Sequence, residues 1–293
     1  MRIGLSTPVV VQVPAVASAW EADGTAEDLA LIARTADEAG LEFLTCSEHV
    51  AVPSAEVASR GAVYWDPLAT LGFLAAHTCR IRLATAVLVL GYHHPLEIAK
   101  QHGTLDRISG GRLLLGVGIG SLAPEFDLIG ADWTSRAQRA DEAIQALRAS
   151  VGVEEPVYQG AFFDYSGMTV QPHALQRQVP IWVGGRSRAS LQRAMRLADG
   201  WMPFGLASEQ IRDLLRQEAA PSGFEVILGS GRALDPTGDS AGVRNRLIEL
   251  AAAGATTVSC SLMARSAEHY CQQIIRLAEI ATALGSDHEE TSR

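Results

Sequence analysis

The sequence predicts an α/β protein in which eight parallel strands, each followed by a helix, close into a (β/α)8 TIM barrel. Short apolar, strand-like runs alternate with amphipathic helical segments along the chain, and eight such pairs can be counted. No short-period internal repeat is present. The chain has 293 residues, a length that one barrel domain commonly occupies. We therefore expect a single barrel domain over residues 1–285.

The first four pairs lie in the amino-terminal half of the chain. Their strands are expected at residues 2–6, 42–47, 81–88 and 113–117, and the last two are nearly unbroken apolar runs typical of strands buried on both faces. Their helices begin at Thr25, at Asp66-Pro67, at Pro95 and at residues 134–135, where capping residues or a first-turn proline precede an apolar helical face. Long loops at residues 7–24, 50–65 and 121–133 separate these elements and are candidates for function.

The last four pairs follow an insertion. Residues 153–180 are rich in aromatic residues, glycine and proline, and we expect a β-hairpin excursion there. The remaining strands are expected at residues 181–185, 200–204, 225–228 and 257–262, and their helices at residues 187–198, 208–219, 240–253 and 266–284. The polar residues 286–293 are expected to form a disordered tail.

Composition excludes several classes of protein. Lys and Arg number 24 against 33 Asp and Glu, a net charge of −9, and no basic stripe is present, so binding to nucleic acid or anionic membranes is not expected. Neither an 18-residue apolar run nor a signal peptide is found, which predicts a cytoplasmic protein without a membrane span. The four cysteines include no CxxC pair and are expected to be reduced.

Barrels place reacting groups at the carboxyl ends of their strands, and Glu48-His49 directly follows the second strand. A histidine there could hold or transfer a proton during a redox step. The alternative is a polar pair that only satisfies the loop. By contrast, His93, His94 and His102 lack the spacing of metal ligands, and no metal site is expected.

Two glycine-rich segments are candidates for binding a phosphate. Gly116-x-Gly118-x-Gly120 ends the fourth strand, but no acidic residue follows at the spacing of a dinucleotide fingerprint, so we expect close approach of a ligand to the backbone. Gly184-Gly185-Arg186-Ser187 precedes a helix whose amino terminus could bind an anion. The alternative for this segment is a glycine-rich turn with a serine cap.

Several motifs together resemble the luciferase-like monooxygenase superfamily, and within it the actinobacterial oxidoreductases that depend on the deazaflavin coenzyme F420. The resemblance runs from about residue 2 to 284 and rests on Thr85-Ala86-Val87, His94-Pro95 with Ala99-Lys100-Gln101, Thr104-Leu105-Asp106-Arg107 with Ser109-Gly110-Gly111-Arg112, and Gly116-Val117-Gly118-x-Gly120. The single lysine among 24 basic residues also favours an actinobacterial source.

The resemblance implies a luciferase-like barrel, a homodimer and hydride transfer between F420 and a small organic substrate. It gives His49 a catalytic or cofactor-stabilising role, with Glu48 as its neighbour. It also implies a non-proline cis peptide between Ala86 and Val87. The cofactor-binding residues that it implies are Thr85, Ala86, Val87, Ile119, Gly120, Ser121, Gly184, Gly185, Arg186 and Ser187.

Other functions stay open at this point. The sister branch of the superfamily uses reduced FMN and oxygen, and sequence spacing separates the two cofactors poorly. A non-catalytic protein that binds a flavin or deazaflavin is a second alternative. A metal-dependent barrel hydrolase is disfavoured by the missing ligand pattern.

Overall fold

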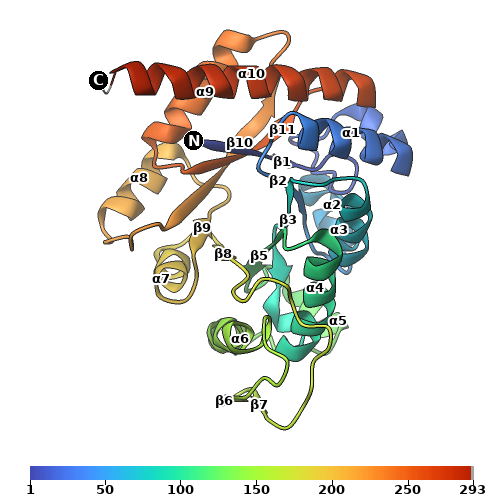
Figure 1. Ribbon diagram of the computed structural model, residues 1–293, viewed down its shortest axis with the longest axis vertical. Coiled ribbons are helices and arrows are strands. Elements are labelled where there is room, and N and C mark those ends of the chain that lie inside the picture. Colours follow the sequence, from blue (N-terminus) through green and yellow to red (C-terminus); the bar gives the residue numbers. More distant parts are fainter. Residues whose placement is uncertain (292–293) are drawn as a thin grey trace.

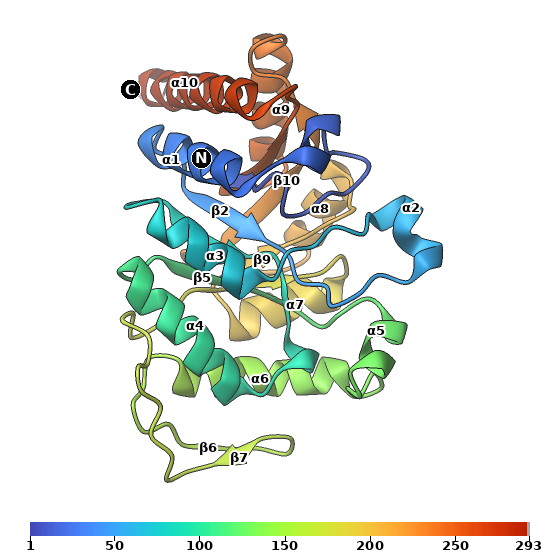
Figure 2. The ribbon, with the colours of Figure 1, turned by 90° about the vertical axis from the view of Figure 1, so that its right-hand side faces the viewer.

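The computed structural model describes residues 1–291 and consists of a parallel barrel enclosed by helices (Figures 1 and 2). The barrel strands are β1 (Arg2–Ser6), β2 (Phe43–Cys46), β3 (Arg82–Thr85), β4 (Leu88–Val89), β5 (Leu113–Gly118), β8 (Ile181–Gly184), β9 (Gly200–Met202), β10 (Glu225–Leu234) and β11 (Thr257–Leu262). They pair in the order β3-β2-β1-β11-β10-β9-β8-β5-β4. A further pairing of β3 with β5 closes the ring, and the predicted barrel is confirmed.

Eight longer helices alternate with the strands, as the sequence predicts. They are α1 (Ala26–Glu38), α3 (Pro67–Ala76), α4 (Pro95–Ser109), α6 (Arg136–Ser150), α7 (Arg188–Leu197), α8 (Ser208–Arg216), α9 (Ser240–Ala252) and α10 (Ala267–Thr291). The predicted start signals act as expected: Thr25 accepts a hydrogen bond from the Asp28 amide, and Asp66 accepts one from the Ala69 amide. Both views show α1 and α10 side by side on the outside of the barrel.

The insertion at residues 153–180 contains the predicted hairpin. Its strands are β6 (Tyr158–Gln159) and β7 (Asp164–Tyr165), which pair antiparallel. Figure 2 shows the hairpin projecting beyond α6, away from the barrel. Tyr165 anchors it, because its hydroxyl lies 2.6 Å from Ser150 Oγ on α6.

The structure corrects three expectations about local structure. The run at residues 81–88 is two short strands, β3 and β4, because the chain bends at Ala86 and Val87 between them. The expected loops contain short helices: η1 (Ala19–Asp23), η2 (Ser54–Glu56), α2 (Val57–Arg60) and α5 (Ala123–Leu128), with η3 (Leu90–Tyr92) following β4. The seventh barrel strand, β10, is longer than predicted because it continues past an irregularity at Gly229 to Leu234.

One small apolar cluster fills the interior of the barrel. Phe43, Ala84, Leu114, Trp182 and Ile227 come from five different strands and are buried together. The Phe43 and Trp182 rings meet edge to face, with their centroids 5.3 Å apart. Because the interior is packed here, any space for a ligand must lie toward one end of the barrel.

The carboxyl-terminal helix α10 is described to Thr291. The side chains of residues 286–291 and all of residues 292–293 lie outside the described part, so the disordered tail expected at 286–293 stays a prediction. Within residues 1–291, we find no helix with the length and apolar character needed to cross a membrane.

Candidate functional site

His49 lies three residues after β2, at the carboxyl end of the barrel strands. Its Nδ1 is 2.9 Å from Glu125 Oε2, and its ring meets the Tyr64 ring edge to face at 4.5 Å. The side chain is 16% exposed, so solvent or a ligand can reach it. His49 is therefore held in a fixed orientation at the position where a barrel places reacting groups.

Glu125, on the short helix α5, was not among the predicted site residues. Its side chain is fully buried and accepts hydrogen bonds from His49 Nδ1, the Tyr92 hydroxyl (2.6 Å) and the amides of Val50 and Ala51. Burial opposes ionisation, but these donors outweigh it and hold the pKa of Glu125 below its ordinary value of 4.5. Pro124-Glu125, a proline and an acid in a first helical turn, is a helix-start signal that could have pointed to α5.

The ionised state of Glu125 determines which nitrogen of His49 carries the proton. A carboxylate can only accept hydrogen bonds, so Nδ1 of His49 must donate to it. In the neutral imidazole, Nε2 then has a free lone pair, and it has no hydrogen-bond partner among residues 1–291. The arrangement therefore presents a histidine that can accept a proton at Nε2 and return it.

Glu48 does not contact His49 through its carboxylate. Its Oε1 lies 2.6 Å from His93 Nε2, and its Oε2 accepts a hydrogen bond from the Val89 amide at 2.6 Å. Although burial opposes it, the bond to Glu48 raises the pKa of His93. Glu48 thus fixes the segment after the bend at residues 86–87, while Glu125 orients His49.

The other two histidines of that region have separate environments. His94 caps α4, since its Nδ1 accepts a hydrogen bond from the Leu96 amide at 3.2 Å. His102 is buried in α4, and burial lowers its pKa to about 4. Within residues 1–291, we find no group of three side chains suited to hold a metal ion.

The bend between β3 and β4 is fixed from both neighbouring strands. The peptide between Ala86 and Val87 is cis, as predicted. On one side, Ser47 Oγ donates to the Ala86 carbonyl at 2.6 Å, and the Ala86 amide donates to Cys46. On the other, Thr85 Oγ1 donates to the Gly116 carbonyl at 2.7 Å. Thr85 is fully buried, whereas Ala86 and Val87 are partly exposed and offer a surface to a ligand.

The glycines of β5 and β8 make room for this bend. A Cβ atom at Gly116 would lie 2.0 Å from the Thr85 carbonyl oxygen, and one at Gly184 would lie 2.8 Å from a methyl group of Val87. The structure therefore brings Val87 and Gly184 together. It gives these two glycines a packing role, in addition to the ligand role that the sequence suggested.

The remaining predicted cofactor residues lie at residues 119–121 after β5 and at residues 185–187 after β8, and we call them the predicted cofactor rim. Ile119 and Gly120 are partly buried, and Ser121 is exposed, with its hydroxyl 3.4 Å from Arg60 Nη1. Ser187 caps α7 by accepting a hydrogen bond from the Ser190 amide, as the alternative interpretation expected. Arg186 is exposed, with its guanidinium 5.9 Å from the Phe204 ring centre, and makes no ion pair within residues 1–291.

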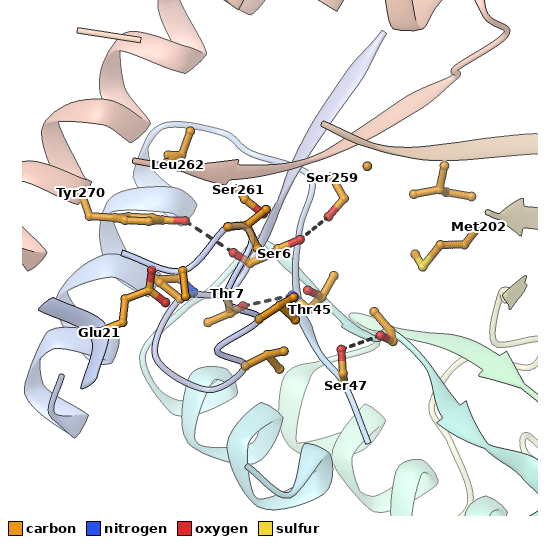
Figure 3. Close-up of a pocket in the computed structure, with 18 of the residues that line it drawn as sticks. Ser6, Thr7, Glu21, Thr45, Ser47, Met202, Ser259, Ser261, Leu262 and Tyr270 are labelled. Atoms are coloured by element: carbon orange, nitrogen blue, oxygen red, sulfur yellow. Dashed lines mark hydrogen bonds between the residues drawn. The ribbon is translucent and has the colours of Figure 1, made fainter. Parts of the chain in front are cut away.

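A cavity of about 230 Å³ opens at the barrel mouth (Figure 3). Its walls come from the loop at residues 7–24 and from β1, β2, β9, β10 and β11 and the residues that follow them. Of the ten predicted cofactor residues, only Ala86 lines it. The cavity therefore adjoins the bend and the predicted cofactor rim without coinciding with them.

Comparison with known proteins gives the following likenesses. The model of the family described as luciferase-like monooxygenase matches residues 1–242. An uncharacterized protein of Mycobacterium tuberculosis is 32% identical over 216 residues, which cover 73% of this chain and 75% of that protein. An FMNH(2)-dependent dimethylsulfone monooxygenase of Pseudomonas putida is 34% identical over 163 residues, 53% of this chain and 45% of that protein.

Among solved structures, an F420-dependent secondary alcohol dehydrogenase in complex with an F420–acetone adduct superposes with a TM-score of 0.71. The alignment covers 94% of this chain and 98% of that chain at 15% identity. At this level of identity, the likeness establishes the fold alone.

Proposed function

The chain belongs to the luciferase-like monooxygenase family, and we propose that it is an oxidoreductase that transfers a hydride between deazaflavin coenzyme F420 and a small organic substrate. The observation that carries this proposal is the orientation of His49, whose Nδ1 is held by the buried carboxylate of Glu125. A hydride transfer to or from an alcohol or carbonyl compound needs a partner that takes up or supplies a proton. His49 Nε2 is suited to that task.

The bend at residues 86–87 and the predicted cofactor rim would suit a planar ring with an anionic tail. Ala86 and Val87 present a partly exposed surface, and Ile119 and Gly120 of the predicted cofactor rim are also partly exposed. The rim carries two guanidinium groups, those of Arg60 and Arg186, together with the exposed hydroxyl of Ser121. Guanidinium and hydroxyl groups are suited to a phosphate-bearing tail.

In this proposal, each group of the chain has a defined task. A bound deazaflavin would supply the carbon centre that exchanges a hydride. His49 would hold or release the substrate proton at Nε2, and Glu125 would keep the imidazole in that tautomer. Glu48, through Val89 and His93, would keep the segment after Val87 in place.

A second candidate function, that of a monooxygenase using reduced FMN and oxygen, is favoured by one specific likeness. The Pseudomonas putida relative is named as dependent on FMNH(2), and it is more than 30% identical to the matched part of this chain. Both cofactors have a planar tricyclic ring and a phosphate-bearing tail, so the same bend and rim suit either of them. We keep F420 as the proposal because a fixed proton-exchanging histidine serves hydride transfer directly. A cytoplasmic homodimer is part of the same proposal.

The proposal is tested by following the oxidation of reduced F420, without oxygen, with a panel of small aldehydes and ketones. We expect oxidation that requires both the protein and one of the carbonyl compounds. The His49→Ala variant should slow it about 100-fold or more, because general acid–base catalysis commonly contributes that much. An unchanged rate in this variant would remove His49 from the mechanism. Turnover only with reduced FMN and oxygen would favour the monooxygenase.

A further inference from the structure

Of the ten predicted cofactor residues, only Ala86 lines the cavity at the barrel mouth. The cavity is walled by β1, β2, β9, β10 and β11 and by the loop at residues 7–24, whereas the predicted cofactor rim follows β5 and β8. The two regions meet at Ala86, and Ser47 in the cavity wall donates a hydrogen bond to the Ala86 carbonyl, as drawn in Figure 3. A molecule in the cavity would therefore lie next to whatever rests on the bend. This is the position that the second reactant needs. Because His49 does not itself line the cavity, a proton would pass between the substrate and Nε2 through a water molecule or a neighbouring hydroxyl.

The cavity wall offers no positive charge to an anionic ligand. No residue that lines it is Arg, Lys or His in the part of the chain that the structure describes. Its one carboxylic acid, Glu21, is buried and is bound by the loop, since its two oxygens accept hydrogen bonds from the amides of Ser18 (2.7 Å) and Val9 (2.9 Å). Placing an anion here would bury it without a countercharge, which is costly.

Hydroxyl groups supply the polar part of the wall. Ser6 Oγ and Ser259 Oγ bind each other at 3.1 Å, and Thr7 Oγ1 accepts the Thr45 amide. Two hydroxyls, those of Thr45 and Ser261, line the cavity and make no hydrogen bond to any residue within 1–291. Figure 3 shows both side chains at the cavity, with no dashed line from either hydroxyl. They can bind an oxygen atom of a ligand.

The rest of the wall is apolar and the space is small. Val11, Val13, Val16, Ile227 and Leu262 are among the apolar side chains that line it. Its volume of about 230 Å³ exceeds the roughly 150 Å³ at which a protein cavity accepts benzene. A six-membered carbon ring with one oxygen substituent is of matching size.

We propose that this cavity holds the substrate and that the substrate is an uncharged, mainly apolar molecule whose hydroxyl or carbonyl oxygen binds Thr45 and Ser261. The proposal rests on the proposed function and narrows it, because it excludes phosphorylated, carboxylated and ammonium substrates. A neutral ligand loses little hydration free energy on entering an apolar cavity. The hydrogen bonds that its oxygen made to water are replaced by hydrogen bonds to the two free hydroxyls.

The test uses the full-length protein and four probes that share one ring and differ in charge: cyclohexanol, cyclohexanone, cyclohexanecarboxylate and cyclohexylammonium. Dissociation constants are measured by ligand-observed NMR, first without cofactor. We expect the two neutral probes to bind at least tenfold more tightly than the two ions. Equal or tighter binding of either ion, or no binding of the neutral probes, would overturn the proposal.

Variants locate the binding. A Cβ at Gly229, in the cavity wall, would meet only one atom, at 4.0 Å, so Gly229→Leu should fill the cavity and abolish binding of the neutral probes. Gly72→Leu on α3 is the matched control, because its Cβ also lies in open space. Thr45→Val should weaken cyclohexanone binding about 2–10-fold through the loss of one neutral hydrogen bond, and exposed Ser222→Ala should not. Unchanged affinity in Gly229→Leu would contradict the assignment.

A second titration separates this proposal from the cofactor assignment. If F420 binds beside the cavity, the neutral probes should still bind to the protein saturated with F420. Displacement of the probes by F420 would show that the cavity belongs to the cofactor and would overturn the proposal. Binding of the neutral probes to a protein that does not bind F420 would keep the cavity assignment and refute the proposed function.

Discussion

The Glu125→Gln substitution isolates the group that sets the tautomer of His49. Glu125 Oε1 faces the amides of Val50 and Ala51, and Oε2 faces His49 Nδ1 and the Tyr92 hydroxyl. In glutamine, the carbonyl oxygen must stay with the two amides, because those amides can only donate. The new NH₂ group then points at His49 Nδ1, which has to become an acceptor. The proton moves to Nε2, and the free lone pair on Nε2 is lost.

The expected effect has two parts. Hydrogen bonds to a charged group contribute about 1.5–3 kcal/mol each, so exchanging the carboxylate for an amide that keeps some of its partners should destabilise the fold by about 2–4 kcal/mol at pH 7. The difference in unfolding free energy between the natural protein and Glu125→Gln should shrink as the pH falls below about 4.5. Because the donors hold the pKa of Glu125 below its ordinary value, their stabilisation is present above that value and is lost as Glu125 protonates in the folded state. The hydride-transfer rate should fall about 100-fold.

The assay that needs no substrate is the ¹⁵N chemical shift of the two His49 ring nitrogens at neutral pH. We expect protonated Nδ1 in the natural protein and protonated Nε2 in Glu125→Gln. Tyr92→Phe is the matched control, because it removes one donor to Glu125 and leaves the bond to His49 in place. Protonated Nε2 in the natural protein, or the same tautomer in both proteins, would refute the reasoning.

Three further predictions concern the rim, the bend and the pH dependence of stability. Arg186→Glu should raise the dissociation constant of F420 about tenfold without changing the Tm. Arg177→Glu, at an exposed arginine of the insertion with no ion pair within residues 1–291, should leave both unchanged, and equal affinity of the two variants would move the anion site elsewhere. Gly116→Ala should destabilise the fold by about 3 kcal/mol in urea unfolding, because its Cβ would lie 2.0 Å from the Thr85 oxygen, while Gly72→Ala has free space and should not destabilise it. Because Glu48 raises the pKa of His93 above 6.5, their pairing stabilises the fold fully below that pH and is lost as the pH rises through the folded-state pKa. Urea unfolding between pH 6 and 9 should show this loss in the natural protein, and the loss should be smaller in Glu48→Gln.

The barrel could be predicted from the sequence because its signals are local. The buried strand at 113–117 is a continuous apolar run, and the structure has β5 there. Helix starts at Thr25 and Asp66 are set by side chains that bond to amides within the same turn. Such features need no knowledge of the rest of the chain.

The site could be predicted only in part, because its contacts join residues far apart in sequence. The place of His49 after a strand predicts a role for it, but its partner Glu125 lies 76 residues later, on a helix too short to show periodicity. Glu48 was expected as the neighbour of His49, and the structure shows that its carboxylate binds His93 and the Val89 amide. Sequence position alone does not tell to which side a loop side chain turns.

The cavity was not predicted at all. Its free hydroxyls, Thr45 and Ser261, lie on β2 and β11, which are not paired with each other and are both adjacent to β1. Thr45 is one polar residue in the otherwise apolar β2, whereas Ser261 is one of three hydroxyl-bearing residues in β11, with Thr257 and Ser259. Neither pattern by itself indicates a cavity. Only the closed ring of strands shows that both face the same space.

The central claim, that this barrel binds a deazaflavin for hydride transfer, is tested most directly by an equilibrium fluorescence titration of the protein with F420 and, separately, with FMN. The account predicts micromolar or tighter binding of F420, and clearly weaker binding of FMN. Tighter binding of FMN than of F420, or no binding of F420, would contradict it.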